Sequence, residues 1–325
     1  MKDDAVVTFD FLVGFTIFII SFIFVAAMVP HALFAVQSSR IDYDAVAYRT
    51  GVILTEDPGM PASPDFPVWE YQMVSSDVVR MGLAVEKGAP HILSLGKVER
   101  FFDTNFFTYP DDYRRSLIFG DYPYSFNITL TAQGIIRSIG PDPPASYGTV
   151  RRVVAVKEPS ILSIDGVLHP EYHVAVNTTP NQRFAVEIPC ALLLNRSVEP
   201  AFRIDPRTDP LQIDIRNFDQ YLNATDPATL TEIRISRDGI ILPFTAYTLI
   251  VDESVATLPV EVSESVFFIL HPVPHPPWRE QDTLGITFVF DDDPPEAMIT
   301  GTHMYDYVNV TLPDLRRGTL EVAIW

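Results

Sequence analysis

The sequence is poor in cysteine and in basic residues, and both shortages exclude classes of protein. Its 325 residues include one cysteine, Cys190, which excludes a disulfide framework and a four-thiolate zinc site. Because Pro189 and an apolar run flank Cys190, we expect a buried thiol. Lys and Arg total 23 against 42 Asp and Glu, a net charge of −19. Since a negative surface repels phosphate, we expect no nucleic-acid partner.

Motifs of common enzymes are also missing. The chain has no Gly-x-Ser-x-Gly elbow, no glycine-rich phosphate loop, no His-Glu-x-x-His and no paired Cys-x-x-Cys. These patterns mark many hydrolases, nucleotide-binding proteins and zinc proteins. Carboxylates are numerous, but no pair is singled out as a glycosidase site. We therefore expect no enzymatic activity, no cofactor and no bound metal.

Two acidic loops remain as candidates for ion binding. Residues 291–293 are three aspartates before two prolines, and Asp205 and Asp209 lie in a second acidic loop. Ca²⁺ takes six or more oxygen ligands, and neither loop has EF-hand spacing. Each loop is therefore either a solvated turn, which we favour, or part of an ion site.

The histidines do not form a metal motif either. His271 and His275 are four residues apart, but the prolines around them exclude a helix that would bring both to one metal. We expect an extended arm with Trp278, either an exposed docking arm or a rigid connection. His169 and His173 are expected to lie on the surface.

Apolar residues are abundant near the N-terminus. Residues 11–29 run for 19 positions without a charge, and as a helix they span roughly 28 Å, close to a bilayer's hydrocarbon core. A buried core helix is the alternative, but such a helix rarely has apolar side chains all round. We predict a leader and transmembrane segment over residues 1–37, with a lipid bilayer as partner.

The apolar run is predicted to continue as an amphipathic stalk. Apolar residues recur at helical spacing from 41 to 52, and Glu56-Asp57-Pro58-Gly59 marks the helix end. One helix over residues 10–55 would span roughly 69 Å. We therefore predict a long helix whose first half lies in lipid and whose second half packs one face on a sheet.

The remainder is predicted to be rich in β-structure. Helices are predicted at 76–84, 95–102 and 111–119, and a strand at 122–131. Further short strands, punctuated by Pro, Gly, Asp and Asn, are predicted at 150–156, 172–176, 183–188, 212–215, 232–236, 245–251, 265–270, 285–290, 307–312 and 319–324. The predicted fold class is α+β: a long N-terminal membrane and stalk helix, then a β-rich head, mainly an antiparallel β-sandwich. After region 1–37, residues 38–132 form the stalk helix and a small α+β subdomain, and 133–325 form the sandwich domain.

Glycosylation sequons indicate on which side of the membrane the head lies. Five of the eight asparagines stand in Asn-x-Ser/Thr, whereas the Ser and Thr content predicts about one by chance. Because sequons matter only outside the cell, we expect an extracellular, glycosylated head. Coincidence in a threonine-rich β protein is the alternative. The candidate residues are Asn127, Asn177, Asn195, Asn223 and Asn309.

Several stretches resemble the archaeal type IV pilin-like secreted proteins, an uncharacterised family with one N-terminal membrane segment and a β-rich head. None of the stretches is a chemical signature. They are TFDFLVGFTIFIISFIFV (8–25), AYRTGVILTEDPG (47–59), VVRMGLA (78–84), RRSLIFGDYPYSFNITL (114–130), VRRVVAVK (150–157) and LEVAIW (320–325). The resemblance implies a surface or filament role and no known activity.

The resemblance also gives the leader an interpretation. Cleavage between Ala5 and Val6 would make Asp10 the fifth residue of the mature chain. The resemblance implies that Asp10 then meets the N-terminal amine of a neighbouring subunit, so other pilin-like subunits would be partners through the N-terminal helix. Asp10 is otherwise an interfacial residue that the helix dipole favours. Asp3 and Asp4 stand where prepilin leaders carry basic residues, and a cleaved signal peptide or an uncleaved anchor are the alternatives.

These expectations combine into one hypothesis with an alternative. We expect a single-pass cell-membrane protein with its C-terminal head outside the cell. We expect a pilin-like surface protein, and a minor filament subunit more than a bulk one because its head is large for a pilin. The alternative is a non-polymerising protein of the cell surface that serves in binding, adhesion or envelope structure.

Overall fold

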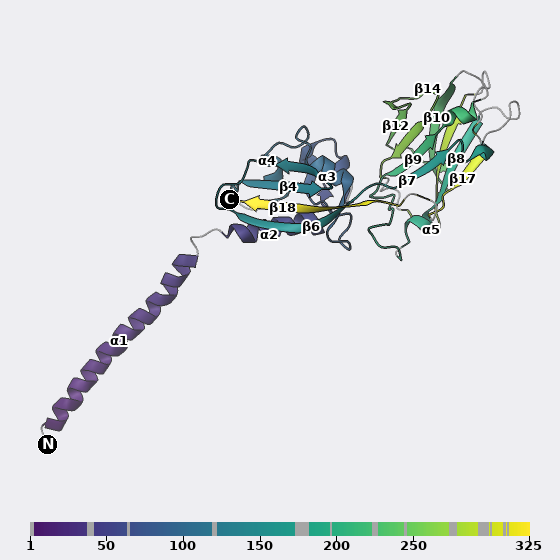
Figure 1. Cartoon of the computed structure of the whole chain (residues 1–325). Coiled ribbons are helices and arrows are strands. Elements are labelled where there is room, and N and C mark those ends of the chain that lie inside the picture. The colour runs from purple at the N-terminus through teal and green to yellow at the C-terminus, as the bar shows by residue number, and fades with distance from the viewer. Residues whose placement is uncertain are drawn as a thin grey trace.

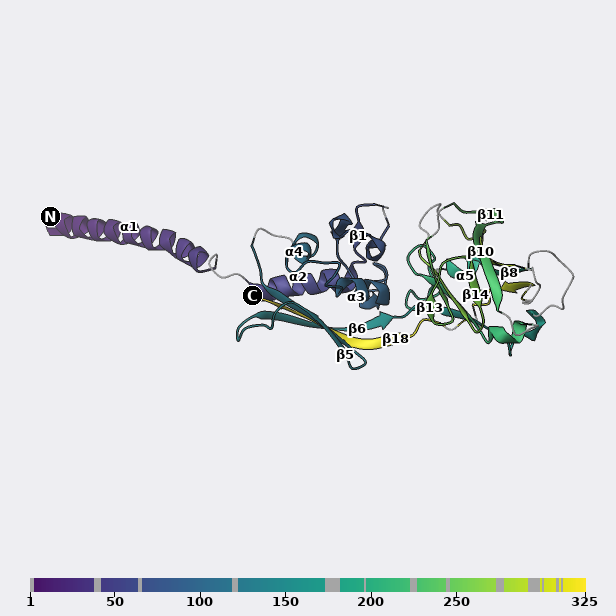
Figure 2. The ribbon, with the colours of Figure 1, turned by 90° about the horizontal axis from the view of Figure 1, so that it is seen from above.

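One apolar helix is followed by a β-rich head in the computed structural model (Figure 1). Helix α1 (Asp3–Gln37) projects away from two lobes that follow one another (Figures 1 and 2). The structure describes residues 3–37, 42–63, 66–118, 122–172, 182–195, 197–222, 227–243, 246–272, 278–291, 299, 301–307, 310 and 312–325. The predicted order, a helix and then a β-rich body, is confirmed.

A second helix, α2 (Tyr43–Glu56), begins independently of α1. Asp42 is its N-cap, with non-helical angles of φ −83° and ψ 87°, and its Oδ1 accepts a hydrogen bond from the amide of Ala45 at 3.1 Å. An aspartate side chain that binds the free amides of the first turn favours a helix start at this point. The single helix predicted over residues 10–55 is therefore wrong, whereas its predicted end near Glu56 is confirmed.

The lobe next to α1, here called the proximal domain, consists of residues 43–157 and 315–325. Its main sheet has the strand order β3-β6-β18-β4-β5, and β1 and β2 form a separate pair. Helices α2, α3 and α4 lie on one face of the main sheet (Figure 2). Its elements after α2 are β1 (Met60–Pro61), β2 (Val78–Arg80), β3 (Ile92–Ser94), α3 (Leu95–Phe101), α4 (Asp111–Ser116), β4 (Phe126–Ala132), β5 (Ile135–Ile139), β6 (Gly148–Lys157) and β18 (Leu315–Ile324).

Small residues and tight turns allow this packing. A Cβ on Gly51 would lie 2.8 Å from Cγ1 of Val150, so glycine lets α2 approach β6 closely. Gln133 and Gly134 both have positive φ, the conformation that a two-residue hairpin between β4 and β5 requires. The resulting core includes Leu54, Trp69 and other buried side chains of α2–α4 and the sheet.

The far lobe, the distal domain, contains two sheets. One has the order β11-β10-β16-β8-β17 with β14 also paired to β10, and the other has the order β13-β12-β15-β9-β7. Its elements are β7 (Ile161–Asp165), β8 (Gln182–Pro189), α5 (Cys190–Leu193), β9 (Leu211–Arg216), β10 (Ala228–Arg237), β11 (Ile240–Ile241), β12 (Tyr247–Val251), β13 (Ser254–Val255), β14 (Val260–Val262), β15 (Val266–Leu270), β16 (Thr283–Phe290) and β17 (Gly301–Met304).

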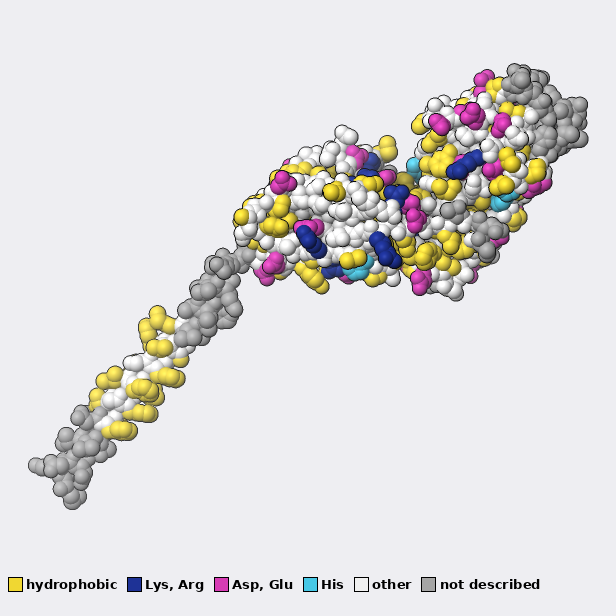
Figure 3. Space-filling model, viewed as in Figure 1, with side chains coloured by type: hydrophobic (Ala, Val, Ile, Leu, Met, Phe, Trp, Pro, Cys, Tyr) yellow, Lys and Arg dark blue, Asp and Glu magenta, His cyan; other side chains and the backbone are white. Residues whose placement is uncertain are grey.

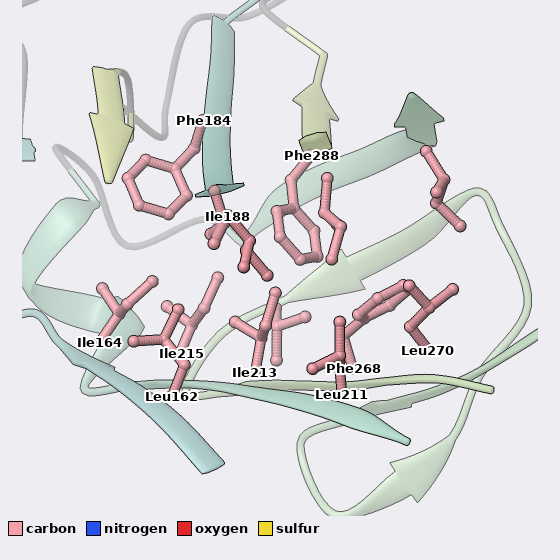
Figure 4. Packing of buried hydrophobic residues seen from close by; sticks show 14 of the residues in the cluster. Leu162, Ile164, Phe184, Ile188, Leu211, Ile213, Ile215, Phe268, Leu270 and Phe288 are labelled. Carbon is pink, nitrogen blue, oxygen red and sulfur yellow. The ribbon is translucent and has the colours of Figure 1, made fainter. Parts of the chain in front are cut away.

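One hydrophobic core joins the two sheets of the distal domain. Figure 4 shows Phe184 and Phe288 of one sheet pointing toward Ile213 and Phe268 of the other. The rings of Phe268 and Phe288 are 5.6 Å apart in an edge-on contact. Because alternate residues of each strand supply this core, the period-two pattern of these strands reflects burial of one face.

The sheets of the head are mixed. Among the strand pairs that the structure describes, β3–β6, β7–β9 and β8–β17 are parallel and the others are antiparallel. The boundary predicted at residue 133 falls within the β4–β5 turn, and β5, β6 and β18 belong to the proximal sheet. These strands join the proximal sheet through long-range pairing, since β18 hydrogen-bonds to both β4 and β6.

Most helices and strands predicted from local sequence patterns are confirmed, and one predicted helix is wrong. The helix predicted at 76–84 is wrong, because β2 occupies part of it. Most of the predicted strand at 172–176 and half of the one at 307–312 lie outside the described residues. Predicted elements that are confirmed in position are α3, α4, β4, β6, β8, β9, β10, β12, β15, β16 and β18.

Candidate functional sites

Helix α1 presents apolar side chains in all directions over Phe11–Met28. Its window Phe11–Met28 is long and apolar enough to cross a membrane, and within the described residues none of that window is buried. Phe11 and Phe24 are 72% and 64% exposed, and apolar side chains follow this stretch of helix (Figure 3). Such a surface is costly in water and matches the hydrocarbon of a bilayer.

The predicted leader and assembly residues lie in the same helix. Ala5, Val6 and Asp10 belong to the backbone of α1, and their side chains lie outside the described residues. Their predicted roles in cleavage and assembly therefore stay predictions.

The predicted glycosylation residues differ in accessibility. Nδ2 of Asn127, the atom that would carry a glycan, donates hydrogen bonds to Ser138 Oγ at 3.2 Å and to the carbonyls of Gly140 and Pro141 at 3.1 Å each. Asn195 is exposed on the surface. The folded head therefore leaves Asn195 open to modification and encloses Asn127. The predicted sites Asn177, Asn223 and Asn309 lie outside the described residues.

A cavity of about 460 Å³ lies where the proximal and distal domains meet. Its walls come from the turn Trp69–Tyr71, the start of α3, the β6–β7 connection, the segment before β9 and the end of β15. Lys and Arg side chains lie beside Asp and Glu at the junction of the two lobes (Figure 3). We call this cavity the interdomain cleft.

Polar contacts hold the two domains together beside the cleft. Nζ of the buried Lys157 donates to the Arg203 carbonyl at 2.5 Å and to Oδ2 of Asp209 at 3.0 Å. Arg203 in turn pairs with Glu86 of the proximal domain at 3.3 Å. Charged groups thus bridge the two domains on one side of the cleft.

These contacts correct the interpretation of one acidic loop. Asp209 pairs with buried Lys157, and Asp205 forms a bidentate pair with Arg207. The predicted turn is present, because the amide of Asp209 donates to the Asp205 carbonyl at 2.6 Å. Both aspartates are paired with cations in it, so they are structural partners and not free solvated carboxylates.

Glu70 is the unusual group of the cleft. It is 8% exposed, and its Oε2 is enclosed without a hydrogen-bond partner among the described residues. Burial raises the pKa of Glu70 to about 7, although the charge of Lys97 acts in the opposite direction, and nearby Asp209 raises it further. The carboxyl group of Glu70 therefore has a pKa of about 7 and lies beside an open cavity.

Lys97 is the cation whose charge acts on Glu70. It is 1% exposed, and Nζ donates to the carbonyls of Pro58 at 2.8 Å and Ala84 at 3.2 Å. Burial lowers its pKa, which the charge of Glu70 partly offsets. Lys97 therefore links α3 to the two chain segments that contain Pro58 and Ala84.

A Ser-x-x-Lys motif, Ser94-Leu95-Gly96-Lys97, lies at this position and was missed at the level of sequence. In acyl-transfer enzymes with this spacing, the lysine stands close to the serine nucleophile. Ser94 lines the cleft, but within the part of the chain that the structure describes, Nζ of Lys97 bonds to the two carbonyls and not to Ser94. The geometry therefore gives Lys97 a packing role.

Metal ligands do not gather in the described parts of the chain. Among those residues, no three His, Cys, Asp or Glu side chains are placed to hold an ion. The predicted acidic run 291–293 and the histidines at 173 and 275 lie wholly or partly outside them. Cys190 is buried, as predicted, and burial raises its pKa to about 11.

Two expectations about aromatic and histidine residues need correction. Trp278 is 5% exposed and belongs to the distal core, so it is not the tip of an exposed docking arm. His169 is half-buried and stacks on Tyr172, with ring centroids 5.9 Å apart. It is therefore packed and is not a free surface residue.

Comparisons with known proteins identify no family. No family model matches the chain, and no solved structure matches it. A protein of Archaeoglobus fulgidus, described as an uncharacterized protein, is 39% identical over 61 residues. This match covers 19% of the present chain and 32% of that protein, so it spans about a third of the relative.

Proposed function

We propose that this protein is a surface protein, anchored in the cell membrane by α1, with its two-domain head outside the cell. The observation that carries this proposal is the exposed apolar window Phe11–Met28. A soluble protein would gain by burying these side chains against its own head. The head instead has separate, complete cores of its own.

Two features, the sheet architecture of the distal domain and one accessible sequon, support an outward orientation of the head. The chain end at Trp325 lies near the start of α2, and the distal domain lies farthest from α1 (Figure 1). The distal domain, with two sheets facing each other across one core, fits a mainly antiparallel β-sandwich of the kind used as a surface module. The accessible sequon at Asn195 fits a position where glycosylation occurs.

A non-polymerising role in binding or envelope structure fits the structure better than a filament role. The N-cap at Asp42 starts α2 anew, whereas the predicted stalk was one helix running from the membrane into the head. The interdomain cleft offers a binding site on a monomer. The filament subunit remains the second candidate, supported by the sequence resemblance and by Asp10.

Limited proteolysis of intact cells tests the anchored, outward orientation. Added protease is expected to remove the head epitopes while a membrane-embedded fragment containing α1 remains. Complete protection of the head on intact cells, with digestion only after lysis, would place the head inside and contradict the proposal. A cytoplasmic protein followed in the same sample controls for lysis.

The N-terminal mass of the native protein separates the two candidates. A chain that begins at Val6 supports the filament subunit, whereas an intact Met1 supports the simple anchor. A start at Met28 would indicate a removed signal peptide and would contradict anchoring by α1. If the chain begins at Val6, Asp10→Ala should abolish incorporation into filaments without loss of membrane insertion.

A further inference from the structure

The walls of the interdomain cleft combine negative charge with apolar surface. Four carboxylates line it, those of Glu70, Glu99, Glu158 and Asp209, against the single ammonium of Lys157. Lys157 is already bound to Asp209 and to the Arg203 carbonyl. Carboxylates therefore outnumber cations among the lining side chains, and this disfavours phosphates and carboxylates as occupants.

Glu70 provides a specific contact point in this cleft. The other three carboxylates have cationic partners: Arg137 lies 3.5 Å from Glu99, Arg316 pairs with Glu158, and Lys157 pairs with Asp209. Glu70 differs, because Lys97, whose charge acts on it, donates instead to two backbone carbonyls. Its Oε2 has no hydrogen-bond partner among the described residues, although the residue is only 8% exposed. A buried acceptor without a donor is costly, and a ligand donor would satisfy it.

Apolar and aromatic groups surround this carboxylate. Leu95, Ile161 and Ile269 line the cleft with several prolines. The rings of Tyr71 and His271 meet edge to face across the domain boundary, 5.3 Å apart. An alkyl chain fits such walls, and an ammonium group is attracted both by a carboxylate and by the face of an aromatic ring.

We propose that the interdomain cleft binds a small linear aliphatic amine, with its ammonium group at Glu70 and its methylene chain along the apolar walls. The site is independent of the membrane anchor. It makes the head a receptor for a compact cation, with binding surfaces contributed by both domains. Occupancy would therefore favour the arrangement of the two domains in which the cleft is formed.

Calorimetry on the full chain in non-ionic detergent tests the ligand class. The probes are 1,5-diaminopentane, pentylamine, 1-pentanol and CaCl₂. Both amines should bind, whereas pentanol, which lacks the charge, and Ca²⁺, which lacks the chain, should not. Equal binding of pentanol and pentylamine, or binding of Ca²⁺ in competition with the amine, would overturn the proposal.

Two variants locate the site. Glu70→Gln should weaken 1,5-diaminopentane binding by about tenfold or more, because it removes the charge from the hydrogen-bond acceptor. The matched control is Glu261→Gln on the exposed face of β14, outside the cleft lining, which should change affinity by less than about threefold, as expected for a solvated charge. Equal effects of the two changes would contradict a specific role for Glu70.

Gly96→Leu tests the cleft without altering a charge. A Cβ at Gly96 would lie 4.0 Å from Cγ of Glu70 and from Oγ of Ser94, an ordinary contact distance, so a longer side chain extends into the cleft. We expect loss of amine binding with an unchanged melting temperature. Should Glu70→Gln fail to fold, Gly96→Leu decides the matter, and unaltered binding by this variant would refute the site.

The pH dependence of amine binding distinguishes a binding role of Glu70 from a purely structural one. Binding needs ionised Glu70, which is faced by Lys97 of α3, Asp209, neighbouring Tyr71 and, beyond Asp209, Lys157. Since the pKa of Glu70 is raised to about 7, amine affinity should fall toward tenfold per pH unit below this value. Burial lowers the pKa of His271, so this ring becomes charged at lower pH than an exposed histidine would. A pH-independent affinity between pH 5.5 and 7.5 would contradict the assignment.

Discussion

Helices α1 and α2 follow one another in the chain but have different surroundings. In α1 the described side chains over Phe11–Met28 are apolar and unburied. In α2 the buried residues, which include Ala47, Gly51 and Leu54, lie on one face against β6 and β18. The comparison shows that apolar content alone does not assign a helix to a core; the distribution around the axis does so.

The largest effect should come from placing charge in each helix. Ile17→Asp with Ile20→Asp in α1 should release the protein from membranes, because each carboxylate costs about 3 kcal/mol at the centre of a membrane helix. The melting temperature of the head should not change. Leu54→Asp in α2 should give the reverse outcome, an unfolded head on a protein that still sediments with membranes.

A matched leucine substitution measures the difference in packing. Leu54 is 0% exposed and Leu12 is 60% exposed. Leu54→Ala should lower the unfolding free energy of the head by about 3 kcal/mol, the usual cost of a core cavity. Leu12→Ala should leave denaturant unfolding of the head unchanged, and similar losses for both variants would break the comparison.

Changes of pH should affect the head and not the anchor. The pKa of Glu70 rises from 4.5 to about 7 on folding, so between these values the folded state retains a proton that the unfolded state has lost. Raising the pH through this window should therefore lower the unfolding free energy, by up to about 3 kcal/mol. Denaturant titrations of the wild type and Glu70→Gln at several pH values measure this loss.

The variant supplies the control for that titration. Glu70→Gln lacks the titrating carboxyl group, so its stability relative to the wild type should rise from pH 5 to pH 7. Membrane attachment should be constant, because residues 11–28 contain no ionisable side chain. If the stability of the wild type rose between pH 5 and pH 7 as fast as that of the variant, the raised pKa of Glu70 would be excluded.

The smallest effect concerns the point where the two helices separate. Asp42→Ala removes the acceptor for the Ala45 amide and should destabilise the head by about 1 kcal/mol, as for other N-caps. Asp42→Asn retains an acceptor and should cost little. If Asp42→Ala stabilised the head instead, a continuous helix through this position would be the better description.

The sequence predicted features that depend on local pattern. The apolar run 11–29 and the alternation in β8, β15 and β16 are visible because solvent and core select residues at fixed spacing. The two-domain division was not predictable, since β18 joins the proximal sheet from the other end of the chain. The N-cap at Asp42 carried a signal, an Asp before a helical pattern, which the longer apolar periodicity obscured.

The interdomain cleft could not be predicted from the sequence. Glu70, Lys97, Lys157 and Asp209 are widely spaced, and only tertiary packing brings them together. The Ser-x-x-Lys spacing at Ser94 lies in the cleft segment but does not indicate acyl-transfer chemistry, because Lys97 is held by backbone carbonyls. Burial of single charged residues is a property of the fold and leaves no periodic signal.

The most direct test of a lipid-embedded α1 and a self-contained head is to cut the chain between them. A specific protease site inserted between Gln37 and Asp42 allows cleavage in isolated membranes. We predict that the head appears in the supernatant with an unchanged melting temperature while α1 stays with the membranes. A head that stays bound after complete cleavage, or that unfolds on release, would contradict the account.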